Sequence, residues 1–147
     1  MSLTQFFIRA AAAGTLFIAT LASAQSEATG PIATKAGPMY FVRDEYGMVA
    51  LIDTQAFDHL DAKRSVHFDE TAGANGVVTR MLVQTSSGPI LYDFRSNPPL
   101  VQRVGQRMTV KRVFWQGEEV VMQSELGWYG FKRGKLTKLQ SSTSTYH

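Results

Sequence analysis

The stretch GVVTRMLVQTSSGPILYDFR, residues 76–95, decides the fold class. Two runs rich in β-branched and aromatic residues flank the segment TSSG at 85–88, and this composition predicts a β-hairpin with a short loop. Such a loop imposes one register, which pairs Thr79 with Phe94, Arg80 with Asp93, Met81 with Tyr92, Leu82 with Leu91, and Val83 with Ile90. A shift of one residue would mix apolar and charged side chains on both faces, so the sequence specifies this pairing.

The pattern of short β-prone runs and turn residues continues on both sides of this hairpin. Further strands are expected in MYFVR at 39–43, MVALI at 48–52, SVHFDE at 65–70, RMTVKRVFW at 107–115 and EVVMQ at 119–123. Asn75-Gly76 is a strong turn signal before the central hairpin. The register of the 107–123 pair stays open because both of its faces carry apolar residues.

One stretch, DTQAFDHLDAKR at 53–64, departs from this pattern. Asp53 or Thr54 can cap a helix, and the apolar residues that follow have helical spacing, so we expect a short helix there. The apolar residues are Ala56, Phe57 and Leu60. The chain is therefore predicted to be all-β, an antiparallel meander of about eight to ten short strands forming a small barrel or sandwich, with one short helix.

The first 24 residues have the features of a signal peptide. Arg9 precedes an apolar run, and Ala22-Ser23-Ala24 is the small-x-small pattern that signal peptidase reads, so we expect cleavage after Ala24. An uncleaved anchor is the alternative. The apolar run is shorter than the roughly 20 residues that cross a bilayer, and no later segment is long enough, so the mature protein is predicted to have no transmembrane span. The expected location is periplasmic or secreted.

Three segments are expected after the signal peptide. Residues 25–38 predict a flexible leader, residues 39–140 a single β-rich domain, and residues 141–147 a polar tail. The chain contains no cysteine, so an exported form would have neither a disulfide nor a thiol nucleophile.

Charge is distributed unevenly along the chain. Residues 25–99 hold six Lys/Arg and nine Asp/Glu, a net of −3, whereas residues 100–147 hold eight and three, a net of +5. The basic C-terminal half predicts an acidic protein surface or an anionic envelope component as partner, and nucleic acid is not expected in a periplasm. The alternative is a basic face that only keeps the protein soluble.

The candidate binding residues lie in GWYGFKRGKLTKL, residues 127–139. A two-residue turn at Arg133-Gly134 would set Lys132 opposite Lys135, and like charges in that position destabilise a sheet unless something uses them. The same turn gives a core face of Tyr129, Phe131 and Leu136. The predicted binding residues are Trp128, Lys132, Arg133 and Lys135. In the alternative interpretation, these cations only protect a sheet edge from pairing with other chains.

The sequence contains no nucleophile elbow, no phosphate-binding loop and no set of residues with metal-ligand spacing. It therefore predicts a non-enzymatic binding protein without cofactor or metal. Two alternatives remain open. One is a small hydrolase with a site across strands, built from His67, Asp69 and Glu70. The other is a barrel carrier of a small apolar ligand, lined by Met81, Tyr92 and Phe94.

Overall fold

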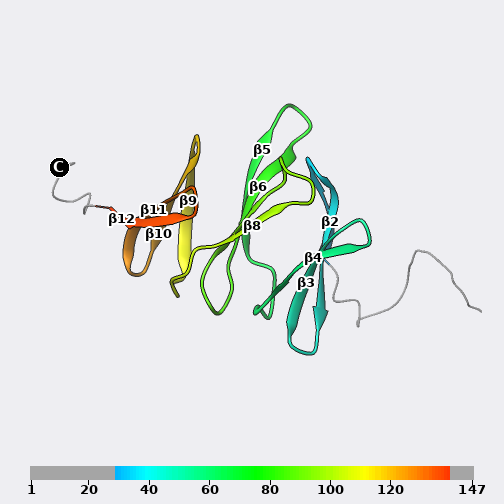
Figure 1. Ribbon diagram of the computed structural model, residues 1–147, viewed down its shortest axis with the longest axis horizontal. Helices are drawn as coiled ribbons and strands as arrows, with labels where there is room; N and C mark the ends of the chain where they lie inside the picture. Colours follow the sequence, from blue (N-terminus) through cyan, green and yellow to red (C-terminus); the bar gives the residue numbers. More distant parts are fainter. Residues whose placement is uncertain (1–28, 140–147) are drawn as a thin grey trace, which may run out of the picture.

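The computed structural model describes residues 29–139, which form twelve β-strands (Figure 1). Within this range there is no helix, so the all-β prediction is confirmed, whereas the predicted short helix is wrong. Nor does any segment between residues 29 and 139 form a helix long and apolar enough to span a membrane. The predicted signal peptide, its cleavage site after Ala24 and the polar tail at 141–147 lie outside the described residues.

The first eight strands form a sheet that is nearly closed into a barrel, here called the barrel sheet. Its order is β4-β3-β2-β1-β6-β7-β8, and β5 pairs with β6 outside this path. The strands are antiparallel to their neighbours except at the short contact between β1 and β6. Their bounds are β1 Thr29–Thr34, β2 Gly37–Asp44, β3 Gly47–Ile52, β4 Gln55–Leu60, β5 His67–Ala72, β6 Val77–Val83, β7 Ile90–Asp93 and β8 Leu100–Arg103.

Side chains bridge the two edges of the barrel sheet. Arg103 of β8 donates to the Asp58 carboxylate of β4 at 2.7 Å, and the Tyr92 hydroxyl of β7 donates to the same carboxylate at 2.6 Å. Burial raises the pKa of Tyr92, and the hydrogen bond to Asp58 raises it further, so the phenol stays a donor. The barrel is thus closed by hydrogen bonds between side chains in place of a backbone ladder.

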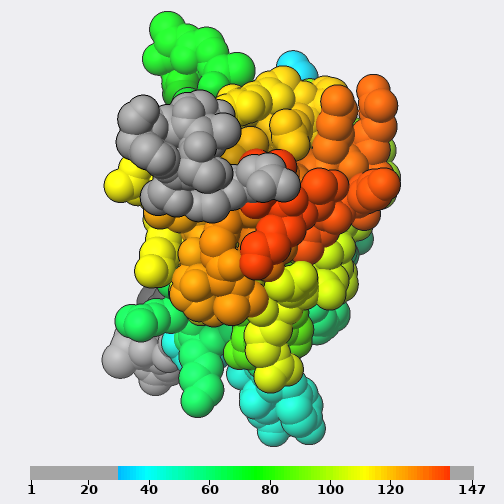
Figure 2. Space-filling model, turned by 90° about the vertical axis from the view of Figure 1, so that its left-hand side faces the viewer, coloured from blue at the N-terminus to red at the C-terminus, as the bar shows by residue number. Residues whose placement is uncertain are grey.

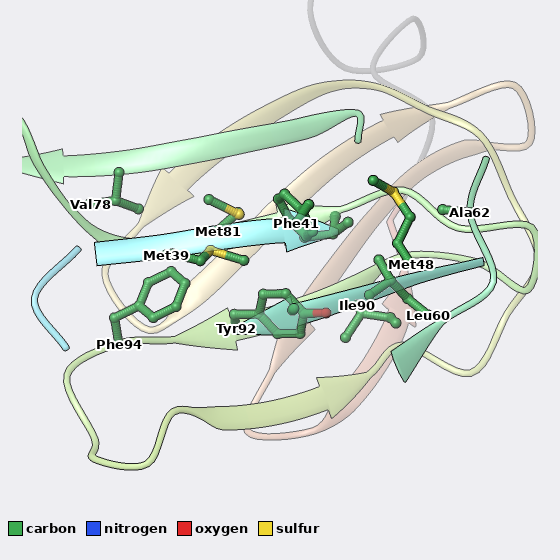
Figure 3. Close-up of a cluster of buried hydrophobic side chains, with 12 residues drawn as sticks. Met39, Phe41, Met48, Leu60, Ala62, Val78, Met81, Ile90, Tyr92 and Phe94 are labelled. Carbon is green, nitrogen blue, oxygen red and sulfur yellow. The ribbon is translucent and has the colours of Figure 1, made fainter. Parts of the chain in front are cut away.

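Apolar side chains pack the interior of the barrel (Figure 3). The Tyr92 ring meets Phe57 edge to face, with ring centroids 4.9 Å apart, and Phe94 at 6.2 Å. Met81, Tyr92 and Phe94, the lining that the carrier alternative needed, are themselves fully buried in this cluster. The whole cluster is Met39, Phe41, Met48, Ala50, Leu60, Ala62, Val78, Met81, Val83, Ile90, Tyr92 and Phe94.

The last four strands form a second sheet, here called the C-terminal sheet, with the order β12-β11-β10-β9. Their bounds are β9 Val110–Gln116, β10 Glu119–Ser124, β11 Gly127–Lys132 and β12 Lys135–Lys138. This sheet packs on the outer side of the β6–β7 hairpin, because Leu82 and Leu91 share a second apolar core with its inner side chains (Figure 1). The buried members of that core are Leu82, Leu91, Val104, Met108, Val110, Val120, Met122, Tyr129 and Phe131.

The predicted register of the β6–β7 hairpin is confirmed at the four pairs from Arg80 opposite Asp93 to Val83 opposite Ile90. Beyond them, the Phe94 amide donates to the Thr79 carbonyl at 2.9 Å. Both faces of this hairpin are buried, one in the barrel and one under the C-terminal sheet. The β9–β10 register, which the sequence left open, is set by a two-residue turn at Gly117-Glu118 that pairs Gln116 with Glu119. Gly117 has a φ of 60°, a conformation that glycine adopts without a steric penalty.

The helix predicted at 53–64 is replaced by β4, and a β-bulge explains the misleading periodicity. Asp58 pairs with Ala50 and Ala56 with Leu51, so Phe57 is the extra residue of the bulge. The bulge lets Phe57 and Leu60 both join the barrel core although they are three residues apart, which is also the spacing of a helix face. Asp53, expected as a helix cap, instead adopts a left-handed turn with φ 54°.

The first strand lies inside the stretch 25–38 that the sequence predicted as a flexible leader. β1 pairs with β2 and contributes Ile32, which packs against the barrel core. Thr34 stabilises the turn between the two strands, donating to the Gly37 carbonyl at 2.6 Å and accepting from the Ala36 amide. β1 therefore places residues 29–34 in the β-rich unit, which the sequence predicted to start at Met39. The sequence signal was weak because only one large apolar residue stands among small residues and prolines.

Arg80 links the two sheets. Its side chain is 3% exposed, and it makes a bidentate ion pair with Glu70 of β5 at 2.6 and 2.9 Å. The same guanidinium donates to the Gly117 carbonyl in the β9–β10 turn at 2.6 Å and lies 5.0 Å from the centre of the Trp115 ring. The predicted cross-strand position of Arg80 opposite Asp93 is confirmed, but the Asp93 carboxylate forms its ion pair with Arg95.

The Arg80–Glu70 and Arg95–Asp93 ion pairs make the free energy of unfolding depend on pH. The hydrogen bond from Arg80 lowers the pKa of Glu70 below its ordinary value of 4.5, and the one from Arg95 lowers the pKa of Asp93 below 3.8. A carboxylate with a lowered pKa stabilises the fold above its ordinary pKa and loses that contribution as the pH falls through the folded-state value. We expect the free energy of unfolding, measured in urea, to fall as the pH drops below about 4.5. Glu70→Gln should flatten this dependence, and an unchanged slope would contradict the assignment.

Candidate functional site

The β11–β12 hairpin has the predicted register. Lys132 lies opposite Lys135 and Phe131 opposite Leu136, while the Leu139 amide donates to the Trp128 carbonyl at 2.9 Å. Arg133 and Gly134 form the two-residue turn with φ values of 51° and 78°, the left-handed pair typical of a tight hairpin. Tyr129 and Phe131 are buried, and Leu136 packs against them, so the predicted core face is confirmed.

The opposite face of the C-terminal sheet points away from the barrel, and Figure 2 looks onto it. Strand alternation places Trp128, Lys132 and Lys135 on this outer face, because Tyr129 and Phe131 face inward. Phe114 reaches the same face from β9 and stacks on Trp128, with ring centroids 5.8 Å apart and an interplanar angle of 26°. Phe114 is 39% exposed. We call Phe114, Trp128, Lys132, Arg133 and Lys135 the basic-aromatic face.

A groove of about 390 Å³ lies beside the turn on this face. It is lined by Glu119, Gly130, Lys132, Arg133, Lys135 and Thr137. The Glu119 carboxylate lies directly over Gly130, where any Cβ would overlap it. Across residues 29–139, Lys132, Arg133 and Lys135 form no ion pair with a carboxylate. Three exposed cations therefore surround a groove with one acid, and their charge is available to a partner.

The structure brings three of the four predicted binding residues together at the β11–β12 turn. Lys132, Arg133 and Lys135 share the turn and its groove, whereas Trp128 lies at the other end of β11 beside Phe114. Sequence reasoning missed Phe114, because the undetermined register of β9 hid which of its aromatic residues faces outward. Trp115, the neighbouring residue, faces the inner core.

The residues of the hydrolase alternative do not converge. His67 Nδ1 lies 2.7 Å from the Asp69 carboxylate. Both residues are on the barrel side of β5, because they pair with Val83 and Met81, whose side chains belong to the barrel core. Glu70 points the other way and is held by Arg80 and Thr79. In the described part of the chain, no group of three histidine or carboxylate side chains is arranged to hold a metal.

A second cluster of cations was not predicted from the sequence. Lys63, Arg64 and Arg107 line a cleft of about 590 Å³, here called the loop cleft. Lys63 and Arg64 belong to the stretch predicted as a helix, in the acidic half of the chain, so neither the charge count nor the pattern singled them out. Only the packing of distant loops places them next to Arg107.

Comparison of the chain with protein-family models, curated proteins and solved structures gives no match.

Proposed function

We propose that the chain is an exported, non-enzymatic binding protein that contacts an acidic protein segment through the basic-aromatic face. The observation that carries this proposal is the set of three cations without ion-pair partners among residues 29–139, grouped around a groove on the same sheet face as a stacked aromatic pair. Charges of one sign gathered around a groove attract and orient a partner of the opposite sign.

The composition of the groove favours a protein segment over an anionic lipid surface. Glu119 lies among the cations, where it would repel a dense layer of headgroups but can accept a hydrogen bond from a backbone amide. The Phe114 and Trp128 rings stack on each other and offer aromatic surface to an aromatic or apolar side chain. An extended segment that carries acidic and aromatic residues matches both features.

The export part of the proposal is supported by residues 1–24. Their apolar run, followed by Ala22-Ser23-Ala24, fits a cleaved signal peptide, and the cysteine-free composition is compatible with any redox compartment. Mass spectrometry of the protein from its native cells should find a mature N-terminus at Gln25.

The binding test compares two variants with equal loss of charge. The face triple carries Lys132→Ser, Arg133→Asn and Lys135→Ser, with Asn chosen because it tolerates the left-handed turn position. The cleft triple carries Lys63→Ser, Arg64→Ser and Arg107→Ser. The probe is a fluorescein-labelled peptide of alternating glutamate and tyrosine, with binding followed by fluorescence anisotropy. We expect the face triple to lose about tenfold in affinity, since three exposed charge contacts at about 0.5 kcal/mol each reach the roughly 1.4 kcal/mol that a tenfold loss requires.

The cleft triple serves as the control and should stay within about twofold of the wild type. Raising the salt concentration should weaken wild-type binding, because exposed charges are screened within about 8 to 10 Å near 0.1 M salt. Equal losses in both triples would mean that net charge alone drives binding. Unchanged affinity in the face triple would exclude this face as the site.

A further inference from the structure

We propose that the loop cleft is a second binding site that takes a small amphiphilic anion, with a phosphate or carboxylate head and a short apolar chain. The site is separate from the basic-aromatic face, shares no lining residue with it, and does not depend on the function proposed above.

Four connections form the walls of the loop cleft. They are the β4–β5 loop with Lys63 and Arg64, the β6–β7 turn with Thr85 and Ser86, the β8–β9 loop with Arg107 to Thr109, and the β10–β11 turn with Glu125. The cleft therefore lies where the barrel sheet meets the C-terminal sheet. Junctions of this kind are common positions for ligand sites in proteins.

Hydrogen bonds hold these loops in place. The Ser86 amide donates to the Asp61 carbonyl at 2.7 Å and the Gln84 amide to the Val66 carbonyl at 2.9 Å, which fixes the β4–β5 loop. The Gln84 side chain donates to the Met108 carbonyl and accepts from the Val110 amide, each at 2.8 Å, which fixes the β8–β9 loop. A cleft ordered before binding spends less free energy on ordering its walls when a ligand enters.

The charge of the cleft is positive. Lys63, Arg64 and Arg107 are exposed and, among the described residues, have no ion-pair partner. Glu125 is the acid among the lining residues, and its carboxylate accepts a hydrogen bond from the Thr109 amide at 2.8 Å. Two guanidinium groups and an ammonium around one cleft are typical of sites for phosphate or carboxylate groups.

The apolar lining of the cleft indicates that the ligand also has an apolar part. Val66 is a large apolar side chain that lines the cleft and is 42% exposed, and it supplies the accessible apolar surface. The other apolar lining residues, Ala62, Met108 and Val110, are buried behind it. Covering such a surface stabilises a complex by about 0.8 kcal/mol for each methylene group removed from water. An inorganic anion would leave this surface exposed, whereas an alkyl phosphate or a short fatty acid would cover it.

The test follows the amide signals of the cleft walls by NMR in the ¹⁵N-labelled protein. The reporters are the Gln84 side-chain amide and the Val110 backbone amide, which belong to the cleft wall. The probes are octyl phosphate, octanoate, inorganic phosphate and uncharged octyl glucoside. We expect octyl phosphate, octanoate or both to shift the reporters to saturation, and the tighter of the two identifies the head group. Inorganic phosphate should bind at least about tenfold more weakly, because burying two methylene groups already supplies that factor.

Variants separate this site from the first one. The cleft triple should lose at least about tenfold in affinity for the alkyl anion, while the face triple should retain wild-type affinity. If the cleft triple does not fold, Arg107→Gln alone tests the same contact with a smaller expected loss. Octyl glucoside binding as tightly as octyl phosphate, inorganic phosphate matching it, or no probe moving the reporters would each overturn the proposal.

Discussion

Arg80→Ala is expected to lower the free energy of unfolding by about 2 to 4 kcal/mol, somewhat less than for a fully buried ion pair, because the Glu70 side chain left behind is 27% exposed. The substitution leaves Glu70 without its bidentate partner and the Gly117 carbonyl without its donor. It also removes the guanidinium that lies over Trp115. Because these contacts join the barrel sheet to the C-terminal sheet, both sheets should unfold at a lower urea concentration.

Arg95→Ala is the matched control for this prediction. Arg95 also bonds two carboxylates, those of Asp93 and Glu118, but its side chain is 40% exposed. Ion pairs at such a surface position contribute about 0 to 1 kcal/mol. The measurement is urea unfolding of both variants, followed by circular dichroism for both sheets and by Trp fluorescence for the C-terminal sheet, which holds both tryptophans. Equal destabilisation by the two substitutions would show that Arg80 does not hold the sheets together.

Gly88→Ala is the second substitution expected to have a large effect, a loss of about 3 kcal/mol or more. Gly88 has a φ of 116°, where a residue with a side chain is strained by about 1 to 3 kcal/mol. In addition, an added Cβ would overlap the carbonyl oxygen of Gln106, so the β8–β9 loop would have to move away from the β6–β7 turn. That movement would also separate two walls of the loop cleft.

Gly105→Ala separates the two causes of this loss. Gly105 also has a positive φ, 84°, and lies in the same β8–β9 loop, but an added Cβ would have no neighbour within 4 Å. It should therefore show only the backbone penalty of about 1 to 2 kcal/mol. Thermal unfolding of the two variants measures the difference. If Gly88→Ala cost no more than Gly105→Ala, the close contact between turn and loop would be contradicted.

Local features of the fold were predictable from the sequence. The β6–β7 and β11–β12 registers follow from the alternation of apolar and polar residues and from short turns such as Arg133-Gly134, and these signals involve only neighbouring residues. The same alternation correctly predicted that Tyr129, Phe131 and Leu136 face the core and that Lys132 and Lys135 face outward. β4 was predicted incorrectly because a bulge at Phe57 imitates helical spacing, and a bulge depends on the partner strand.

Features that depend on distant contacts were not predictable. The hairpin pattern correctly set Arg80 opposite Asp93, but it could not predict the partners of the guanidinium, which come from β5 and from the β9–β10 turn. The loop cleft is assembled from four connections that are far apart in the sequence, and its cations stand in two halves of opposite net charge. No periodic pattern in the sequence predicts that these four loops lie together.

The most direct test of the proposed function uses the two tryptophans as reporters. Trp128 lies on the basic-aromatic face, whereas Trp115 faces the inner core under Arg80. In an NMR titration with the glutamate-tyrosine peptide, we expect the indole N–H signal of Trp128 to shift to saturation while that of Trp115 stays in place. The face triple should abolish the shift. A Trp128 signal that does not move while the peptide binds would contradict the account.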